Sequence, residues 1–259
     1  KVANGNLPSS AEKIDLKKPF LLVSQHPVTT EFGNEESNIL ETLEAVKKEI
    51  RKAEKEAGRI GNSVSLIAVS KIQPKSRIEK VLNQGHRVFG ENRVQEAYTK
   101  WPQWREKFGS LSLHLVGPLQ TNKVKQAMEL FEFIHSLDRE KLARVVADNI
   151  QKLGFAPKFF VQVNTGEEKQ KSGILPKEIG EFFELCTKKL KLPVIGLMCI
   201  PPLKDSASIH FCYLNKLSLK FKLNHLSMGM SSDYDEAIKF GATYVRIGSE
   251  FFGKRTNQI

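Results

Sequence analysis

Lys71 is the residue whose type and position most clearly offer chemistry, because it closes an apolar run that begins at Leu66. Partial burial at the end of a strand lowers the pKa of an amine. An amine that can lose its proton forms a Schiff base with an aldehyde. The alternative is a lysine that extends from the strand end into solvent, as long basic side chains commonly do.

Two later segments, 227–232 and 246–249, combine glycine and serine with apolar neighbours. Small residues let backbone N–H groups approach an anion, and serine hydroxyls can donate to it. Where strands and helices alternate around a barrel, phosphate commonly binds in the loops after the seventh and eighth strands. We therefore expect a phosphate group where these segments meet. The alternative is two ordinary turns between strand and helix.

Arg246 lies within an apolar strand, so its guanidinium is expected to be partly buried and to need a partner. One possibility is a structural salt bridge. The other is a bond to the ring nitrogen of a pyridine-type ligand. Because arginine stays protonated, it would leave that nitrogen without a proton and weaken the ring as an electron sink.

Metal chemistry is not indicated, since neither the histidines nor the cysteines have ligand-type spacing. We expect His114 to be a hydrogen-bonded core histidine. The cysteines are expected to be reduced and buried, as in cytosolic proteins. The other histidines considered are His135, His210 and His225, and the cysteines are Cys186, Cys199 and Cys212.

Strand-like and helix-like segments alternate along most of the chain. The β-rich runs are 65–69, 87–90, 113–116, 133–136, 158–163, 194–198, 225–228 and 244–247. Helical patterns are found at 37–57, 75–84, 123–129, 139–153, 176–190, 206–222 and 233–240. Eight strands in about 200 residues predict an α/β fold of the (β/α)8 TIM-barrel type, with an open doubly wound sheet as the alternative.

The bulk properties fit one globular domain. We expect an N-terminal extension over residues 1–36 and a single barrel over 37–259, within a chain of 259 residues. The chain has no apolar run long enough to cross a membrane and no apolar core of a signal peptide, so we expect a cytoplasmic protein. The net charge of +11 is spread along helices, and no nucleic-acid-binding motif accompanies it.

Seven motifs in order give the chain a resemblance to the pyridoxal phosphate homeostasis proteins (the YggS/PROSC type). The motifs are AVSK at 68–71, FGENRVQE at 89–96, HLVGPLQTNK at 114–123, KSG at 171–173, GLM at 196–198, LSMGMS at 226–231 and VRIGS at 245–249. The resemblance covers about residues 38–255. It implies a fold like the N-terminal barrel of alanine racemase and pyridoxal 5'-phosphate (PLP) as the cofactor.

The resemblance also implies a role for individual residues. Lys71 would carry PLP as an internal aldimine, Asn92 would lie against the cofactor ring, and Arg246 would face the pyridine nitrogen. The phosphate would be held by Ser231, Gly248 and Ser249, with Ser227 and Met228 close by. It assigns no catalytic residue and no established enzymatic activity, but a part in PLP homeostasis.

Two stretches depart from the family pattern. The connection 202–226 is shorter than usual, so we expect a trimmed helix or a tightened loop there. Residues 18–33 instead resemble a segment of the UDP-N-acetylglucosamine 2-epimerases. That segment is too short to bring a nucleotide-sugar site, so we interpret it as an appendage and expect no epimerase activity.

The leading functional hypothesis is a monomeric carrier or buffer of PLP that passes it to PLP-dependent apoenzymes. The alternative is an amino-acid racemase, which needs an acid or base on each face of the substrate α-carbon. Related racemases supply the second group from a C-terminal β-domain, and we expect no such domain after Ile259. We therefore expect an exposed cofactor face. Nucleic-acid binding through charge alone is a third, weaker hypothesis.

Overall fold

The computed structural model describes residues 35–248 and residue 252. The chain divides into two units between Asn34 and Glu35, and the fold below is that of the described residues of the second unit. The expected extension over residues 1–36, with its epimerase-like stretch, therefore lies almost wholly outside the described residues.

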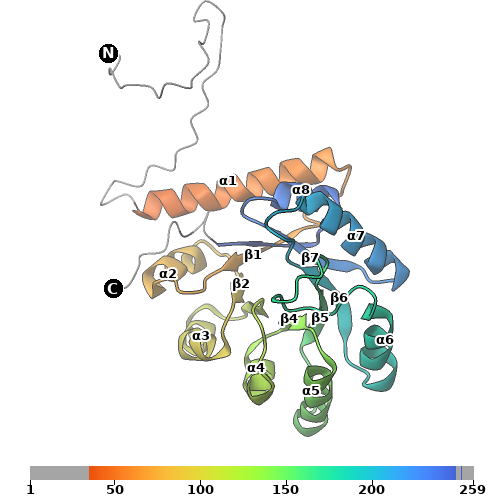
Figure 1. Cartoon of the computed structure of the whole chain (residues 1–259). Helices are drawn as coiled ribbons and strands as arrows, with labels where there is room; N and C mark the ends of the chain where they lie inside the picture. Colours follow the sequence, from red (N-terminus) through yellow and green to blue (C-terminus); the bar gives the residue numbers. More distant parts are fainter. Residues whose placement is uncertain (1–34, 249–251, 253–259) are drawn as a thin grey trace, which may run out of the picture. The chain divides into compact units, whose positions relative to one another are not determined.

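Eight parallel strands close into a barrel, with β8 paired to β1 (Figure 1). The strands are β1 (Ser65–Val69), β2 (Val88–Glu91), β3 (Ser112–Leu115), β4 (Phe133–Leu137), β5 (Lys158–Val163), β6 (Val194–Cys199), β7 (His225–Met230) and β8 (Tyr244–Ile247). The predicted (β/α)8 barrel is confirmed, and the open doubly wound alternative is wrong. In a parallel barrel every carboxyl end opens on the same side, which is where such folds place their chemistry.

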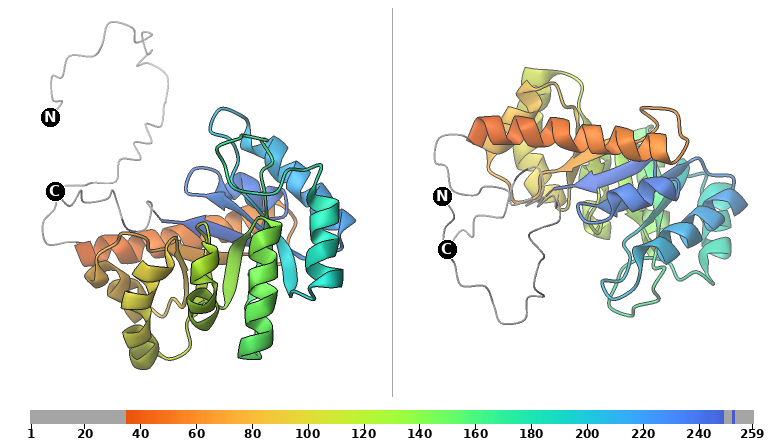
Figure 2. Two further views of the ribbon diagram at one scale, coloured as in Figure 1. Left: turned by 60° about the horizontal axis from the view of Figure 1, so that its bottom comes forward. Right: turned by 90° about the horizontal axis from the view of Figure 1, so that it is seen from above.

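The helices cover the outside of the strands (Figures 1 and 2). They are α1 (Glu35–Glu56), α2 (Lys75–Asn83), α3 (Val94–Phe108), the 3-10 turn η1 (Thr121–Lys123), α4 (Val124–Leu130), α5 (Glu140–Leu153), α6 (Ile179–Glu184), the π-helical turn η2 (Leu185–Lys189), α7 (Ala207–Lys220) and α8 (Tyr234–Lys239). No described helix has the length and apolar character needed to cross a membrane.

Helix α3 is not among the helices named from the sequence. Its interior contains Pro102, which removes a backbone donor and normally breaks a helical pattern. Tertiary packing stabilises the helix nevertheless, because Trp101 and Trp104 are almost completely buried. Their rings pack edge to face with centroids 5.0 Å apart. Helix α7 spans 14 residues of the 202–226 connection, and whether a helix or a loop carries the expected shortening stays a prediction.

Helix α1 lies beside α8 on the outer surface of the barrel (Figure 2). Its apolar side chains recur at helical spacing and join the main hydrophobic core. These residues are Ile39, Leu43, Val46, Ile50 and Ala53. The helix that precedes the first strand is thus part of the barrel's packing.

Replacing Leu43, whose side chain is 1% exposed, by alanine tests this role. We expect Leu43→Ala to lower the free energy of unfolding by about 3 kcal/mol, because it leaves a cavity between α1 and the barrel. Urea denaturation measures the change. The exposed Lys48→Ala on the same helix should change stability by less than about 0.5 kcal/mol. Equal effects of the two substitutions would mean that α1 is not part of the core.

Candidate functional site at the barrel mouth

Four of the described site residues follow the carboxyl ends of four strands, and the parallel closure brings these ends to one mouth. Lys71 lies two residues after β1 and is half-buried, and Asn92 directly follows β2. Ser231 directly follows β7, and Gly248 directly follows β8. Ser249 lies outside the described residues, so its role stays a prediction.

The end of β8 lies tightly against the end of β1. A Cβ atom added to Gly248 would lie 3.0 Å from the carbonyl oxygen of Val69, two residues before Lys71. Only a residue without a side chain leaves this approach unobstructed. The glycine therefore places one predicted phosphate-binding residue next to the strand that carries the lysine.

The turn after β7 is held by its own hydrogen bonds. The Met230 N–H donates to Oδ1 of Asp233 at 2.6 Å, and the Asp233 N–H donates to the Met230 carbonyl at 3.1 Å. Burial raises the pKa of Asp233, partly offset by the Met230 N–H and by Arg246. Gly229 has a φ of 92°, a conformation that favours glycine. These features fix the turn that presents the half-buried Ser231.

Asn92 is positioned by a close approach of the loop after β3. A Cβ on Gly117 would lie 2.3 Å from the carbonyl oxygen of Asn92, which requires glycine at that position. Asn92 lines a cavity of about 290 Å³, together with Asn164 and Lys171 among other residues. Of the described site residues predicted from the sequence, only Asn92 lines this cavity.

Arg246 is a buried cation, with 5% of its surface exposed. Its Nη1 donates to Oγ of Ser227 at 2.7 Å, and its Nη2 donates to the carbonyl of Cys199 at 2.9 Å. Within the described residues it forms no ion pair, so the alternative of a structural salt bridge is wrong there. Burial lowers the pKa of Arg246, although the group remains a cation at neutral pH. A guanidinium has five donors, and two bonds from it to described residues are seen.

Ser227 and Met228 lie within β7 and contact the protein itself. Ser227 is fully buried with its hydroxyl inside the barrel, and Met228 belongs to the hydrophobic core. Successive residues of a strand point to opposite faces, which accounts for the difference. Their predicted proximity to a phosphate stays a prediction.

A chain of hydrogen bonds crosses the barrel interior from Arg246. Beyond Ser227, the Ser227 Oγ lies 2.8 Å from Nδ1 of His135, and Nε2 of His135 lies 2.9 Å from Nδ1 of His114. Nε2 of His114 lies 3.1 Å from Oγ of Ser112, at the amino end of β3. The prediction that His114 is a hydrogen-bonded core histidine is confirmed. His135 links Ser227 to His114, and no local sequence pattern predicts this link.

The direction of these bonds follows from the arginine. A guanidinium can only donate, so Ser227 accepts from it. Among the described residues the Ser227 hydroxyl proton has one acceptor in reach, Nδ1 of His135, so we expect Ser227 to donate there. A neutral imidazole has one donor and one acceptor, so His135 must donate from Nε2 to His114. His114 in turn donates from Nε2 to Ser112. We therefore expect both histidines to be Nε2–H tautomers.

Burial keeps both rings neutral. It lowers the pKa of His114 to about 3, and it holds the pKa of His135 well below the ordinary value, with smaller contributions from His114 and Arg246. In the unfolded chain these rings take up protons below pH of about 6.5. The unfolded state therefore binds more protons in mild acid, and stability falls as the pH is lowered.

Comparison with known proteins shows the family to which this chain belongs. The profile of the family described as "Alanine racemase, N-terminal domain" matches residues 42–256, which defines the class of barrel. The chain is 39% identical over 227 residues to the pyridoxal phosphate homeostasis protein of Aquifex aeolicus, covering 84% of this chain and 99% of that one. The corresponding protein of Vibrio cholerae is 37% identical, covering 84% and 97%. The chain belongs to the pyridoxal phosphate homeostasis protein family.

A solved structure of similar sequence also has this fold. PipY of Synechococcus elongatus, determined with PLP bound, superposes with a TM-score of 0.72 at 33% identity. The match covers 83% of this chain and all of PipY. The resemblance inferred from the motifs is confirmed.

The acid sensitivity of the barrel tests the buried histidines. Between pH 7 and pH 5 we expect His114 to account for a loss of about 2 kcal/mol in the free energy of unfolding, since each pH unit below the unfolded pKa costs about 1.4 kcal/mol. His114→Gln should reduce the pH 7 to pH 5 difference by that amount, whatever its stability at pH 7. Urea denaturation at both pH values measures it, and an unchanged difference would contradict a buried neutral His114.

Long-range ¹⁵N NMR of the histidine rings tests the direction of the chain. We expect Nε2–H for both His114 and His135 in the wild-type protein. Ser227→Ala removes the acceptor of Arg246 and the donor to His135, so it should destabilise the fold by about 1–3 kcal/mol and shift the His135 ring signals. An Nδ1–H tautomer at either ring of the wild type would show that the chain runs otherwise.

Proposed function

We propose that this chain binds PLP and acts in intracellular PLP homeostasis, as a carrier or buffer that holds the cofactor on Lys71. The observation that carries the proposal is the buried guanidinium of Arg246, which has unused donors and no carboxylate partner among the described residues. A pyridine nitrogen is an uncharged acceptor that suits such a donor. The PLP-bound PipY and the names of the relatives support the same cofactor.

The remaining residues would each hold one part of the ligand. Ser231, Gly248 and Ser249 would bind the phosphate. Ser227 and Met228, within β7, would lie close to it. Asn92 would lie against the ring. Gly248 supports this arrangement, because it keeps the end of β8 against β1.

PLP supplies an aldehyde, and Lys71 supplies the amine that captures it. The amine nitrogen adds to the aldehyde carbon, one water molecule leaves, and a C=N bond joins protein and cofactor. The reverse reaction would take up one water molecule and return the aldehyde and the free amine. A bond that forms and breaks in this way suits storage and delivery. We propose delivery to PLP-dependent apoenzymes by a monomer in the cytoplasm.

Racemisation would need a second acid or base opposite Lys71. Tyr244 is the tyrosine inside the barrel, but it is the first residue of β8, at the end away from the mouth. It lies among the rings of His114, Phe160 and His225. No described contact favours the racemase, and an alanine racemisation assay of the loaded protein decides between the two functions.

Absorbance spectra with and without borohydride test the covalent bond. We expect wild type incubated with PLP to show a yellow Schiff-base band that borohydride fixes, and Lys71→Ala to lack it. The matched control is Lys75→Ala, which removes an exposed lysine four residues further on and should keep the band. No band in the wild type, or a band that survives in Lys71→Ala, would refute the proposal.

A further inference from the structure

The turn that carries Lys71 has an unfavourable backbone conformation. Ile72, the next residue, has a φ of 59°, in the left-handed region that β-branched residues rarely adopt. Its side chain is 58% exposed, so packing of that side chain contributes little to the conformation. Something else must hold the turn in place.

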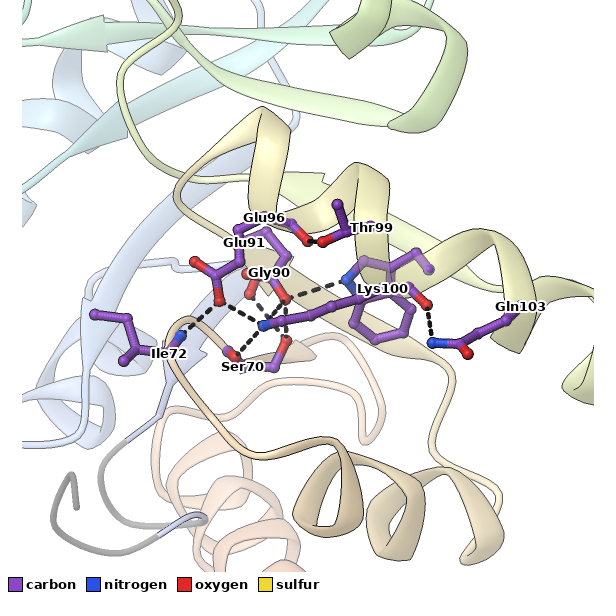
Figure 3. A network of polar contacts seen from close by, with 9 residues as sticks. Ser70, Ile72, Gly90, Glu91, Glu96, Thr99, Lys100 and Gln103 are labelled. Atoms are coloured by element: carbon purple, nitrogen blue, oxygen red, sulfur yellow. Dashed lines mark hydrogen bonds and ion pairs between the residues drawn. The ribbon is translucent and has the colours of Figure 1, made fainter. Parts of the chain in front are cut away.

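Two side chains of α3 bind the peptide groups on either side of Lys71 (Figure 3). Oε1 of Glu96 accepts a hydrogen bond from the N–H of Ile72 at 2.7 Å. Nζ of Lys100 donates to the carbonyl of Ser70 at 3.3 Å. Glu96 and Lys100 are themselves paired at 2.5 Å, one helical turn apart. We call this pair the α3 clamp.

The clamp is anchored in a buried polar network (Figure 3). Nζ of Lys100 lies 3.5 Å from Oε1 of Glu91, which also accepts from the Ser70 hydroxyl at 2.8 Å and from Nε1 of Trp101 at 3.1 Å. Glu91 is fully buried, and burial raises its pKa against the influence of Lys100. Hydrogen bonds in such surroundings are stronger than in water and hold the groups rigidly.

Other ion pairs at the same spacing differ from the clamp. Glu140 and Arg144 on α5 are both more than half exposed, at 59% and 56% of their side chains. The clamp side chains are 22% exposed for Glu96 and 10% for Lys100. Exposed pairs contribute little to stability. The burial of the clamp and its bonds to the backbone of one turn point to a task at that turn.

We propose that Glu96 and Lys100 are positioning residues that fix the backbone on both sides of Lys71 and thereby set how slowly the cofactor is exchanged. The inference rests on the proposed function and deepens it. Neither residue needs to contact the cofactor. With the clamp intact, the Lys71 nitrogen stays where the C=N bond can re-form, and with the clamp broken the turn relaxes and release accelerates.

Exchange with hydroxylamine measures this property. As the C=N bond to Lys71 breaks, a C=N bond to hydroxylamine forms, and the two protons on the hydroxylamine nitrogen pass to the lysine nitrogen. The yellow band disappears with a measurable rate. We expect Glu96→Gln to exchange about tenfold faster than wild type, because a charge-assisted hydrogen bond to the Ile72 N–H is replaced by a neutral one. Lys100→Met should act in the same direction.

The matched control is Glu140→Gln, which neutralises the same residue type in an exposed pair on α5. It should exchange at the wild-type rate. If the Glu96→Gln and Glu140→Gln proteins both exchange at the wild-type rate, the clamp does not set the exchange rate and the inference is wrong.

A second variant separates positioning from general loosening. Asparagine adopts the left-handed region far more readily than isoleucine. Ile72→Asn in the Glu96→Gln background should therefore restore the turn and bring the exchange rate back toward wild type. A double variant that exchanges as fast as Glu96→Gln alone would contradict a role through the strained turn.

Amide hydrogen exchange of the protein without PLP gives a reading that does not depend on loading. The Ile72 amide should exchange about tenfold faster in Glu96→Gln than in wild type or Glu140→Gln. Equal exchange would refute the clamp itself. A wild type that forms no yellow band would instead refute the proposed function, and with it the role of the clamp in cofactor exchange.

Discussion

The pairing of β8 with β1 is the constraint on which the site depends. Ser65 through Ala68 lie in register with Tyr244 through Ile247, so the last strand of the chain completes the sheet begun by the first. Residues separated by about 175 positions thereby reach the same edge. Without this closure, the lysine after β1 and the arginine within β8 would belong to opposite edges of an open sheet.

Closure also encloses a polar interior, which is unusual because such barrels are filled mainly by branched apolar side chains. A buried cation is costly unless its donors are satisfied. Here a serine hydroxyl and a carbonyl accept hydrogen bonds from Arg246. Two neutral histidines extend the hydrogen-bonded chain towards the amino end of β3. The rings of Phe160 and Tyr244 fill the remaining space around them. The interior thus holds a fixed positive charge near the mouth without any carboxylate partner among the described residues.

Much of the fold and part of the site could be predicted from the sequence, because they depend on local pattern. The strands are short apolar runs, and the location of Lys71, Asn92 and Gly248 at the barrel mouth follows from their places after strand ends. The hydrogen-bonded chain could not be predicted, since His114, His135 and Ser227 are 21 and 92 residues apart and meet only through the closed sheet. Likewise, no residue-type rule places an isoleucine at a φ of 59°. That conformation comes from α3, a helix that Pro102 hides from pattern analysis.

Helix α3 joins the packing of the barrel to the lysine turn. Trp101 contacts Phe89 inside the sheet and donates to Glu91, while Trp104 packs on Trp101 and donates to Glu79 of α2. The same helix carries Glu96 and Lys100, in the two turns before Trp104. A substitution that disturbs Trp104 would therefore imitate a defect in the cofactor site, although this tryptophan lies two helical turns beyond Glu96. For substitutions in α3, the distance from Lys71 would therefore be a poor guide to their effect on the cofactor site. Whether a substitution shifts the helix axis would be a better guide.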